Sequence, residues 1–370
     1  MTASSRLIEL FEEQGQSAWL DNLKREFLTS GELERIVATG VRGLTSNPTI
    51  FQKAIQGSND YDDQFAQLVR RGEPVDDAYW DLVVEDILGA LAVFSPVYAS
   101  SRGRDGFVSV EVDPRLAHDT EGTIDAARRL WNRIGQPNLM VKIPATVEGL
   151  PAIRTLIAEG CNINVTLIFG LDRYRKVMEA YIDGLEERRV AGRPVDHVAS
   201  VASFFISRVD SEVDRRLDAV GSPRALDLRG RAAVAQARLA YAAFTETFAG
   251  SRWENLATAG AAVQRPLWAS TSTKNPNYPD TLYVDELIGP ATVNTLPDPT
   301  LVAFVDHGRV ARTIDRDLEG ARRTWESLTD VGIDMDDVAH QLEVEGVAAF
   351  EKSFEELLGA LQEKAALLRR

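Results

Sequence analysis

The chain has 370 residues, of which 44% are hydrophobic, and its formal net charge is −15 at pH 7. A hydrophobic fraction near the average of globular proteins allows a sizeable core and excludes disorder over the whole chain. The acidic surface repels nucleic acid, anionic lipid and, at long range, phosphorylated metabolites, so a phosphorylated ligand would need a local cluster of cations.

Short apolar runs alternate with longer helical segments along the chain. Several of these runs are nearly continuous and flanked by turn residues, which is typical of parallel strands covered on both faces. In chain order, the predicted strands are Ala18–Leu23, Gly43–Asn47, Val108–Val112, Leu139–Pro144, Ile163–Phe169, Val198–Ile206, Leu267–Ser270 and Ala291–Leu296.

The segments between these strands are able to form helices. The clearest predicted helices are Thr123–Ile134, Gly149–Glu159, Asp172–Arg189 and Arg231–Ala249. Such connections favour βα crossover units. Eight strands joined in this way indicate an α/β protein with a (β/α)₈ barrel, and no Gly-x-Gly-x-x-Gly motif supports a Rossmann fold.

Two further segments extend the predicted barrel. Ser58–Leu91 predicts extra helix between strands two and three, and Met335–Arg370 predicts a charged C-terminal helix that caps the barrel. Barrels with insertions exceed the typical length of ~250 residues, so we expect one domain that covers residues 1–370.

Cysteine and histidine usage limits the possible cofactors. Cys161 is the single cysteine, so no internal disulfide can form, which fits a reducing cytoplasm. The four histidines are scattered and none stands in a His-Glu-x-x-His pattern. We therefore expect no metal site and no cofactor.

No segment indicates export or membrane insertion. Residues 1–10 lack a cationic start followed by an apolar segment, so we expect no signal peptide. The longest apolar stretch, Ile87–Ala99, is interrupted by Gly89, Ser95 and Pro96 and is too short to span a bilayer. These features predict a cytoplasmic protein without membrane partners.

Lys142 is the most informative polar residue in a predicted strand. Barrel enzymes carry their reactive groups at the carboxyl ends of the strands, and Lys142 lies there between Val141 and Ile143. Desolvation of a lysine favours its neutral amine, which is the nucleophile in Schiff-base chemistry. A lysine at a strand end that reaches solvent, or that pairs with a carboxylate, explains this segment equally well.

Other predicted strands also end in polar residues. Glu111 lies in the third strand, and Asp21 follows Trp19-Leu20 in the first. Asn164 and Thr166 are two residues apart in the fifth strand and therefore point to the same face. Each residue alone is more often an ion-pair partner, a cap or a structural hydrogen-bonding group. Together they indicate a shared site at the barrel mouth.

Four segments resemble, in this order, motifs of the transaldolase family. They are Thr-Ser-Asn-Pro-Thr-Ile at 45–50, Glu-Val-Asp-Pro-Arg-Leu at 111–116, Met-Val-Lys-Ile-Pro-Ala-Thr at 140–146 and Asn-Ile-Asn-Val-Thr-Leu at 162–167. The resemblance extends from about Trp19 to Leu296. It implies a barrel enzyme that transfers a dihydroxyacetone unit between sugar phosphates through a lysine Schiff base.

The resemblance also implies roles for the catalytic residues. Lys142 would form the imine with a ketose phosphate, and Asp21 would be the general base for the C4 hydroxyl. Glu111 and Thr166 would hold a catalytic water and relay protons while the imine forms and hydrolyses. The enamine must be retained until an acceptor arrives, so its hydroxyls need fixed partners.

For substrate binding, the resemblance implies that Asn47 and Asn164 hold the dihydroxyacetone hydroxyls. Ser203, Phe205 and Arg208 match a Ser-x-Phe-x-x-Arg segment, in which Ser203 faces the sugar and Phe205 forms an apolar wall. Arg208 would clamp phosphate. Local sequence alone favours an ion pair of Arg208 with Asp210 or Glu212.

A second phosphate-binding loop is implied near strand seven. Lys274 stands where many family members have arginine, and an ammonium group can still neutralise a phosphate. Ser270 would add a hydroxyl to this loop, and Ser272 is a second candidate for that place.

The expected partners are sedoheptulose 7-phosphate, glyceraldehyde 3-phosphate, erythrose 4-phosphate and fructose 6-phosphate. For the oligomeric state we expect a monomer or a homodimer. Three alternatives remain. A fructose 6-phosphate aldolase shares the lysine and the barrel, but such chains are much shorter. A deoxyribose-phosphate aldolase does not predict Thr-Ser-Asn-Pro at strand two. A non-catalytic sugar-phosphate-binding barrel could keep the cations and lose Lys142, Asp21 or Glu111.

Overall fold

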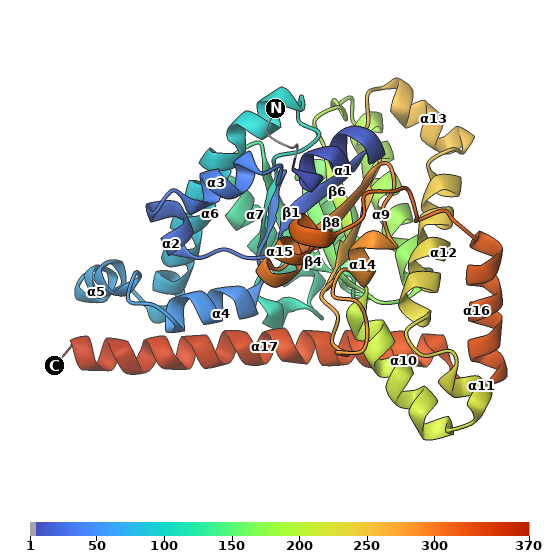
Figure 1. The fold of residues 1–370 in the computed structure, drawn as a ribbon. Helices are drawn as coiled ribbons and strands as arrows, with labels where there is room; N and C mark the ends of the chain where they lie inside the picture. Colours follow the sequence, from blue (N-terminus) through green and yellow to red (C-terminus); the bar gives the residue numbers. More distant parts are fainter. Residues whose placement is uncertain (1–4, 370) are drawn as a thin grey trace.

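The computed structural model describes residues 5–369. Eight parallel strands form a closed barrel whose spatial order is the order of the chain (Figure 1). This topology confirms the predicted (β/α)₈ barrel. The strands are β1 (Gln16–Leu20), β2 (Leu44–Thr45), β3 (Val108–Glu111), β4 (Leu139–Pro144), β5 (Ile163–Ile168), β6 (Ser200–Phe205), β7 (Arg265–Ala269) and β8 (Thr292–Leu296).

Strand β1 closes the barrel by pairing with β8 along its whole length, from Gln16 beside Thr292 to Leu20 beside Leu296. Every strand residue except Arg265 is buried. Helices cover the outside of the sheet, and side chains fill the inside, so parallel strands lose solvent on both faces. The interpretation of the apolar runs as buried parallel strands is therefore confirmed.

Strand β2 is shorter than the predicted Gly43–Asn47. The side chain of Asn47 accepts a hydrogen bond of 3.0 Å from the backbone N–H of Ile50 and so caps helix α4 (Pro48–Gln56). Pro48 occupies the first turn of that helix, where its missing N–H costs nothing. The chain thus turns from strand to helix at Asn47 and holds this residue at the barrel mouth.

Helices connect and surround the strands. Besides α4 they are α1 (Arg6–Gln14), α2 (Arg25–Thr29), α3 (Glu32–Ala38), α5 (Asp62–Arg70), α6 (Val75–Ser100), the 3₁₀ turn η1 (Pro114–Leu116), α7 (Thr120–Ile134), α8 (Gly149–Glu159), α9 (Leu171–Val190), α10 (Ser207–Val220), α11 (Pro223–Leu226), α12 (Ala232–Thr247), α13 (Ser251–Thr258), α14 (Leu282–Asp285), α15 (Asp298–His307), α16 (Leu318–Asp330) and α17 (Met335–Leu368). The four clearest predicted helices correspond to α7, α8, α9 and α12, with small differences at their ends.

Helix α6 is longer than the sequence indicated, since it continues through Pro96 to Ser100. By length and composition it could cross a membrane, but it packs against β3, α5 and α17. Asp86, on this helix, is 1% exposed and forms an ion pair with the Arg25 guanidinium, with an N–O distance of 2.8 Å. Helix α6 is therefore a core helix of the barrel.

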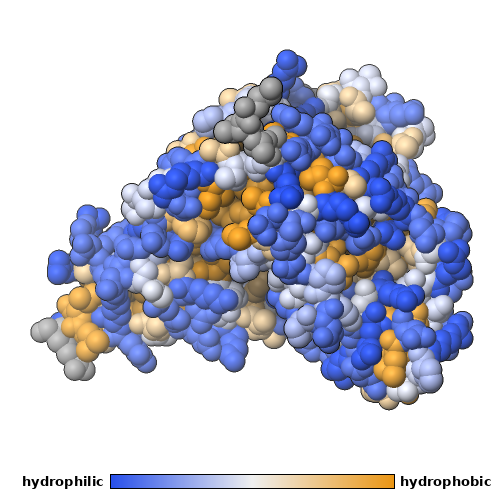
Figure 2. Space-filling view, in the orientation of Figure 1, coloured by the Kyte–Doolittle hydropathy of each residue, from blue (hydrophilic) through white to orange (hydrophobic). Residues whose placement is uncertain are grey.

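Helix α17 forms the predicted C-terminal cap. It packs against α4, α5, α6 and α10 and crosses the structure as one long helix (Figure 1). Phe354 and Leu357 on this helix are each 1% exposed. The outward surface around it is mainly hydrophilic (Figure 2). Arg370, the last residue of the predicted helix, lies outside the described residues.

Candidate active site

A cavity of about 290 Å³ opens at the carboxyl ends of the strands. Of the eleven site residues expected from the sequence, all but Glu111 and Asn164 line it. The nine that line it are Asp21, Asn47, Lys142, Thr166, Ser203, Phe205, Arg208, Ser270 and Lys274.

Lys142 lies inside the barrel mouth on β4 and is only 5% exposed. Its Nζ atom donates a hydrogen bond of 3.1 Å to the carbonyl oxygen of Ser46 and lies 3.2 Å from Oε2 of Glu111. The lysine therefore does not reach bulk solvent. It does have a carboxylate partner, as one of the alternative interpretations expected, but that partner is itself a predicted site residue.

Glu111 lies beside Lys142, because the two residues are register partners on neighbouring strands β3 and β4. Burial raises the pKa of Glu111, and the Lys142 ammonium opposes this rise. Oε2 of Glu111 and Oγ1 of Thr166 are both buried without a hydrogen-bond partner in the described part of the chain. Buried polar atoms in this state are typical of sites that bind an ordered water or a substrate oxygen.

Asp21 follows β1 and faces the cavity. Its Oδ1 atom accepts a hydrogen bond of 2.7 Å from the Thr45 hydroxyl, and its backbone N–H donates one of 2.9 Å to Leu296 O. Burial raises the pKa of Asp21, while Lys142 and the Thr45 hydrogen bond oppose the rise. A carboxylate with a raised pKa beside a buried amine is suited to proton transfer at neutral pH.

Asn47 and Asn164 have different surroundings. Oδ1 of Asn47 is engaged in the cap of α4, and the residue lines the cavity. Asn164 is fully buried: its Nδ2 atom donates to Ser109 Oγ at 3.0 Å, and its Oδ1 atom accepts from Ser203 Oγ at 2.7 Å. The structure therefore brings Asn47 and Ser203 to the cavity surface and leaves Asn164 behind Ser203.

Arg208 does not pair with Asp210 or Glu212, so the local interpretation of this segment is wrong. Asp210 accepts hydrogen bonds from Tyr283 and from the Ala233 backbone, and Glu212 pairs with two other arginines. Among residues 5–369, Arg208 has no ion-pair partner. Its guanidinium lies 5.3 Å from the ring centroid of Phe205, a distance that allows a cation–π contact.

Lys274 reaches the same end of the cavity. Its Nζ atom donates a hydrogen bond of 2.7 Å to Ser272 Oγ, and Ser270 Oγ lies 2.9 Å from Ser207 Oγ. Both candidate serines line the cavity. Burial and the neighbouring Arg208 and Lys53 lower the pKa of Lys274. These cations make this end of the cavity attractive for an anion.

Other residues of the cavity wall were not predicted from the sequence. Lys53 and Ile50 come from α4, and Phe350 comes from α17. Lys53 could have been found from its position six residues after Asn47, once the helix start at Pro48 was recognised. Phe350 carries no such signal, because its place depends on a helix distant in the chain.

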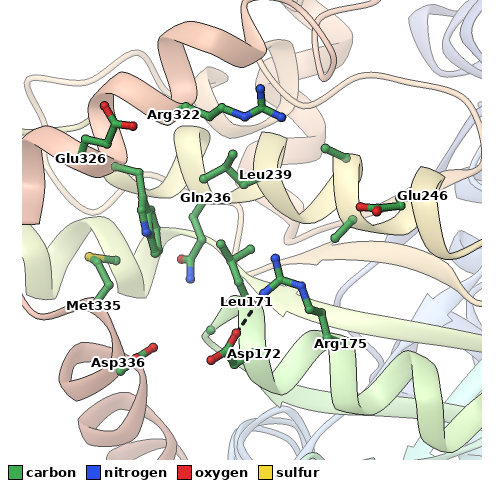
Figure 3. Close-up of a pocket in the computed structure, with 14 residues that line it drawn as sticks. Leu171, Asp172, Arg175, Gln236, Leu239, Glu246, Arg322, Glu326, Met335 and Asp336 are labelled. Atoms are coloured by element: carbon green, nitrogen blue, oxygen red, sulfur yellow. Dashed lines mark hydrogen bonds and ion pairs between the residues drawn. The ribbon is translucent and has the colours of Figure 1, made fainter.

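A second cavity, of about 460 Å³, lies away from the strands between α9, α12 and α16 (Figure 3). Asp172 and Arg175 at its edge pair with each other, with an N–O distance of 2.9 Å. Its wall includes none of the predicted site residues and no lysine. We therefore take the cavity at the barrel mouth as the candidate active site.

Fold and site together define a (β/α)₈ barrel with a buried amine between carboxylates at the base of its mouth and a group of cations at the rim. The chain belongs to the Transaldolase/Fructose-6-phosphate aldolase family, which matches residues 18–361.

Curated relatives match along almost the whole chain. A transaldolase of Parafrankia sp. is 54% identical over 352 residues, which cover 95% of both chains. A transaldolase of Saccharopolyspora erythraea is 51% identical over 366 residues, covering 98% of this chain and 99% of the relative. A transaldolase of Mycobacterium tuberculosis is 50% identical over 361 residues, with 97% of both chains covered.

Proposed function

We propose that this protein is a transaldolase. It would transfer a dihydroxyacetone unit from sedoheptulose 7-phosphate to glyceraldehyde 3-phosphate, giving erythrose 4-phosphate and fructose 6-phosphate. The observation that carries the proposal is the buried Nζ atom of Lys142, which lines the cavity 3.2 Å from a Glu111 oxygen. Relatives of nearly equal length that are named transaldolase support the transferase within this family.

In the first step, the Lys142 amine attacks the C2 carbonyl of the ketose, and loss of water gives an iminium. This step needs a proton acceptor for the amine and a proton donor for the departing hydroxyl. Glu111 and Thr166 are suited to these transfers through a bound water, since each has a buried oxygen without a hydrogen-bond partner among residues 5–369.

In the second step, Asp21 takes the proton of the C4 hydroxyl. The C3–C4 bond breaks, its electron pair passes into the enamine, and an aldose phosphate leaves. The position of Asp21 supports this role, because the carboxylate lines the same cavity as Lys142 and is oriented by Thr45. The enamine carbon then attacks a second aldose phosphate, and Asp21 returns the proton to the new C4 oxygen. Water adds to the resulting iminium, the C–N bond breaks, and the ketose phosphate leaves with the Lys142 amine regenerated.

Retention of the enamine distinguishes a transferase from an aldolase that releases dihydroxyacetone. Asn47 and Ser203 line the cavity with groups able to hold its hydroxyls. Asn164 fixes Ser203 through the hydrogen bond of 2.7 Å and supports the same role indirectly. Phe205 and Ala269 contribute apolar wall that limits water.

The phosphate group of each substrate would bind at the cationic end of the cavity. Arg208 offers a planar guanidinium with no ion-pair partner in the described part of the chain, and Lys274 adds a second charge. Such a pair overcomes locally the repulsion expected from a net charge of −15.

Borohydride trapping tests the proposal. The protein is mixed with fructose 6-phosphate and reduced, and peptide mass spectrometry locates the adduct. We expect a covalent adduct on Lys142. Absence of an adduct contradicts the enzyme and favours a non-catalytic sugar-phosphate-binding barrel.

A second measurement separates transferase from aldolase. Fructose 6-phosphate is supplied with and without erythrose 4-phosphate, and the products are separated by chromatography. A transaldolase forms sedoheptulose 7-phosphate and releases little free dihydroxyacetone. Free dihydroxyacetone as the main product, with or without the acceptor, identifies a fructose 6-phosphate aldolase instead.

We also propose that the protein works in the cytoplasm. Cys161 is a free, buried thiol, and burial raises its pKa to about 12. A chain without a disulfide in its described residues is suited to a reducing compartment. Fractionation of the cells of origin, with activity measured in each fraction, tests this location.

A further inference from the structure

Lys53 lies on the face of α4 that borders the candidate active site. Asn47, Ile50 and Lys53 are spaced by three residues, and all three line the cavity. Residues three apart in a helix lie on the same face, so α4 presents one continuous edge to the substrate. Lys53 stands at the outer end of this edge and is exposed.

Next to this edge, α4 is held by α17 through Thr49, which also lines the cavity, and through Gln52. Thr49 Oγ1 lies 2.8 Å from Ser353 Oγ, and Gln52 Nε2 donates a hydrogen bond of 2.7 Å to Glu356 Oε2. These contacts hold the helix backbone in place. The flexible four-carbon side chain of Lys53 can therefore move its ammonium group, while the Cα atom of Lys53 stays beside the cavity.

Lys53 adds a third cation to the end of the cavity that already holds Arg208 and Lys274. The charge of Lys53 is close enough to contribute to the lowered pKa of Lys274. Within residues 5–369, neither Lys53 nor Arg208 has an ion-pair partner, and Lys274 bonds only to a serine hydroxyl. The three cations repel one another, and the carboxylates that act on Arg208, those of Glu345, Asp21 and Glu111, form no ion pair with it in the described residues. A bound anion would therefore be stabilised between the cations.

We propose that Lys53 is a further phosphate-binding residue, which contacts the dianionic phosphate of the aldose acceptor together with Arg208 and Lys274. The inference rests on the proposed function. Lys53 thereby sets how strongly the enzyme prefers phosphorylated over unphosphorylated acceptors. In the double-displacement reaction the first aldose phosphate leaves before the acceptor binds, so one phosphate subsite serves both sugars.

The test compares Lys53→Gln and Lys53→Arg with the parent enzyme. The value of kcat/KM is measured for erythrose 4-phosphate and for unphosphorylated D-glyceraldehyde, with fructose 6-phosphate as the donor. In a double-displacement reaction, the kcat/KM of the acceptor reports only on the second half-reaction. Lys176→Gln is the matched control, because Lys176 is an exposed helical lysine outside the cavity.

For Lys53→Gln we expect a fall of about tenfold in kcat/KM for erythrose 4-phosphate, as is usual on loss of one charged contact. The value for D-glyceraldehyde stays within about twofold, and the inhibition constant of inorganic phosphate rises by a similar factor of about ten. Lys53→Arg keeps most of the preference, and Lys176→Gln matches the parent.

Two results overturn the inference. Unchanged kinetics for Lys53→Gln show that the side chain does not contact phosphate, and an equal loss with both acceptors shows that it acts through the packing of α4. Borohydride trapping on the same variant separates the two proposals. An adduct on Lys142 with unchanged acceptor preference rejects only the role of Lys53, whereas no adduct in the parent protein rejects the transaldolase.

Discussion

The Nζ atom of Lys142 and the Oε2 atom of Glu111 lie 3.2 Å apart, yet Oε2 has no partner with hydrogen-bond geometry. Both side chains are buried, so water does not screen the interaction. The Glu111 carboxylate thus holds Lys142 in the barrel mouth and can accept a proton from it. The other polar contact of Nζ is the backbone carbonyl of Ser46. The amine is available to a substrate in the cavity.

Lys142→Ala should abolish transfer, because the cavity wall offers only Lys53 and Lys274 as other amines, and both lie at the phosphate end. We expect kcat/KM to fall by at least a thousandfold, which is about 4 kcal/mol in the barrier. Activity is measured with fructose 6-phosphate and erythrose 4-phosphate. A residual rate within about tenfold of the parent contradicts the role of Lys142.

The acid limb of the pH profile should report Asp21. Burial raises its pKa above the ordinary value of 3.8, and only the ionised form can accept the C4 proton. Activity should therefore fall, as pH decreases, at a higher pH than for an exposed aspartate. Asp21→Asn should still form the borohydride adduct but should no longer cleave the C3–C4 bond. An Asp21→Asn variant that retains transfer with an unchanged profile disproves the assignment.

Arg208→Ala should weaken binding of phosphorylated donors more than of free dihydroxyacetone. Loss of a charged hydrogen-bonding contact costs about 1.5–3 kcal/mol, so KM for fructose 6-phosphate should rise roughly ten- to a hundredfold. Equal effects of Arg208→Ala on both donors argue against a phosphate contact.

Lys274→Arg is a conservative comparison for the second cation. It introduces a planar guanidinium, as the resemblance to the family implies at this position, and activity should stay within about threefold of the parent.

Asp210 offers a test of stability apart from catalysis. Burial raises its pKa to about 6 from the ordinary value of 3.8, although Tyr283 and the Ala233 backbone donate hydrogen bonds to it. A folded-state pKa above the unfolded value means that this group stabilises the protein below about pH 4 relative to neutral pH, and that this contribution is lost as pH rises through about 6.

Asp210→Asn should remove this dependence, because an amide has no charge to bury. Its oxygen can accept from the Ala233 N–H, and its NH2 group can donate to the Tyr283 hydroxyl, which then acts as the acceptor. The free energy of unfolding of the parent relative to the variant should fall by about 3 kcal/mol between pH 4 and pH 7. Urea denaturation at several pH values measures this difference. Parallel stability curves for the two proteins would refute the burial effect.

The barrel was predictable because its signals are local. Buried parallel strands require continuous apolar runs, and a polar residue in such a run, such as Lys142, is costly unless it has a function. The end of β2 was less predictable. Because Asn47 caps α4, the strand ends at Thr45, two residues earlier than predicted. The only local signal for this is Pro48, which favours the start of a helix.

The wall of the cavity depends more on contacts between distant segments. Arg208 lacks the expected acidic partners because Asp210 turns toward Tyr283, which comes from helix α14, far along the chain. Phe350 reaches the cavity only because α17 crosses the mouth. The sequence pattern of a single segment does not predict contacts of this kind between distant segments. The single domain over residues 1–370 and the individual catalytic roles remain predictions.

The hydrogen bond from the Asp21 backbone to Leu296 has a consequence for how the protein matures. Lys142 and Glu111 lie on adjacent strands, so they can meet early, when only the middle of the chain has condensed. Asp21 has its full set of contacts only when the first strand is joined to the last as well as to β2. The nucleophile and its carboxylate therefore depend on neighbouring strands in the middle of the chain, whereas the base depends on the joining of the two ends of the sheet.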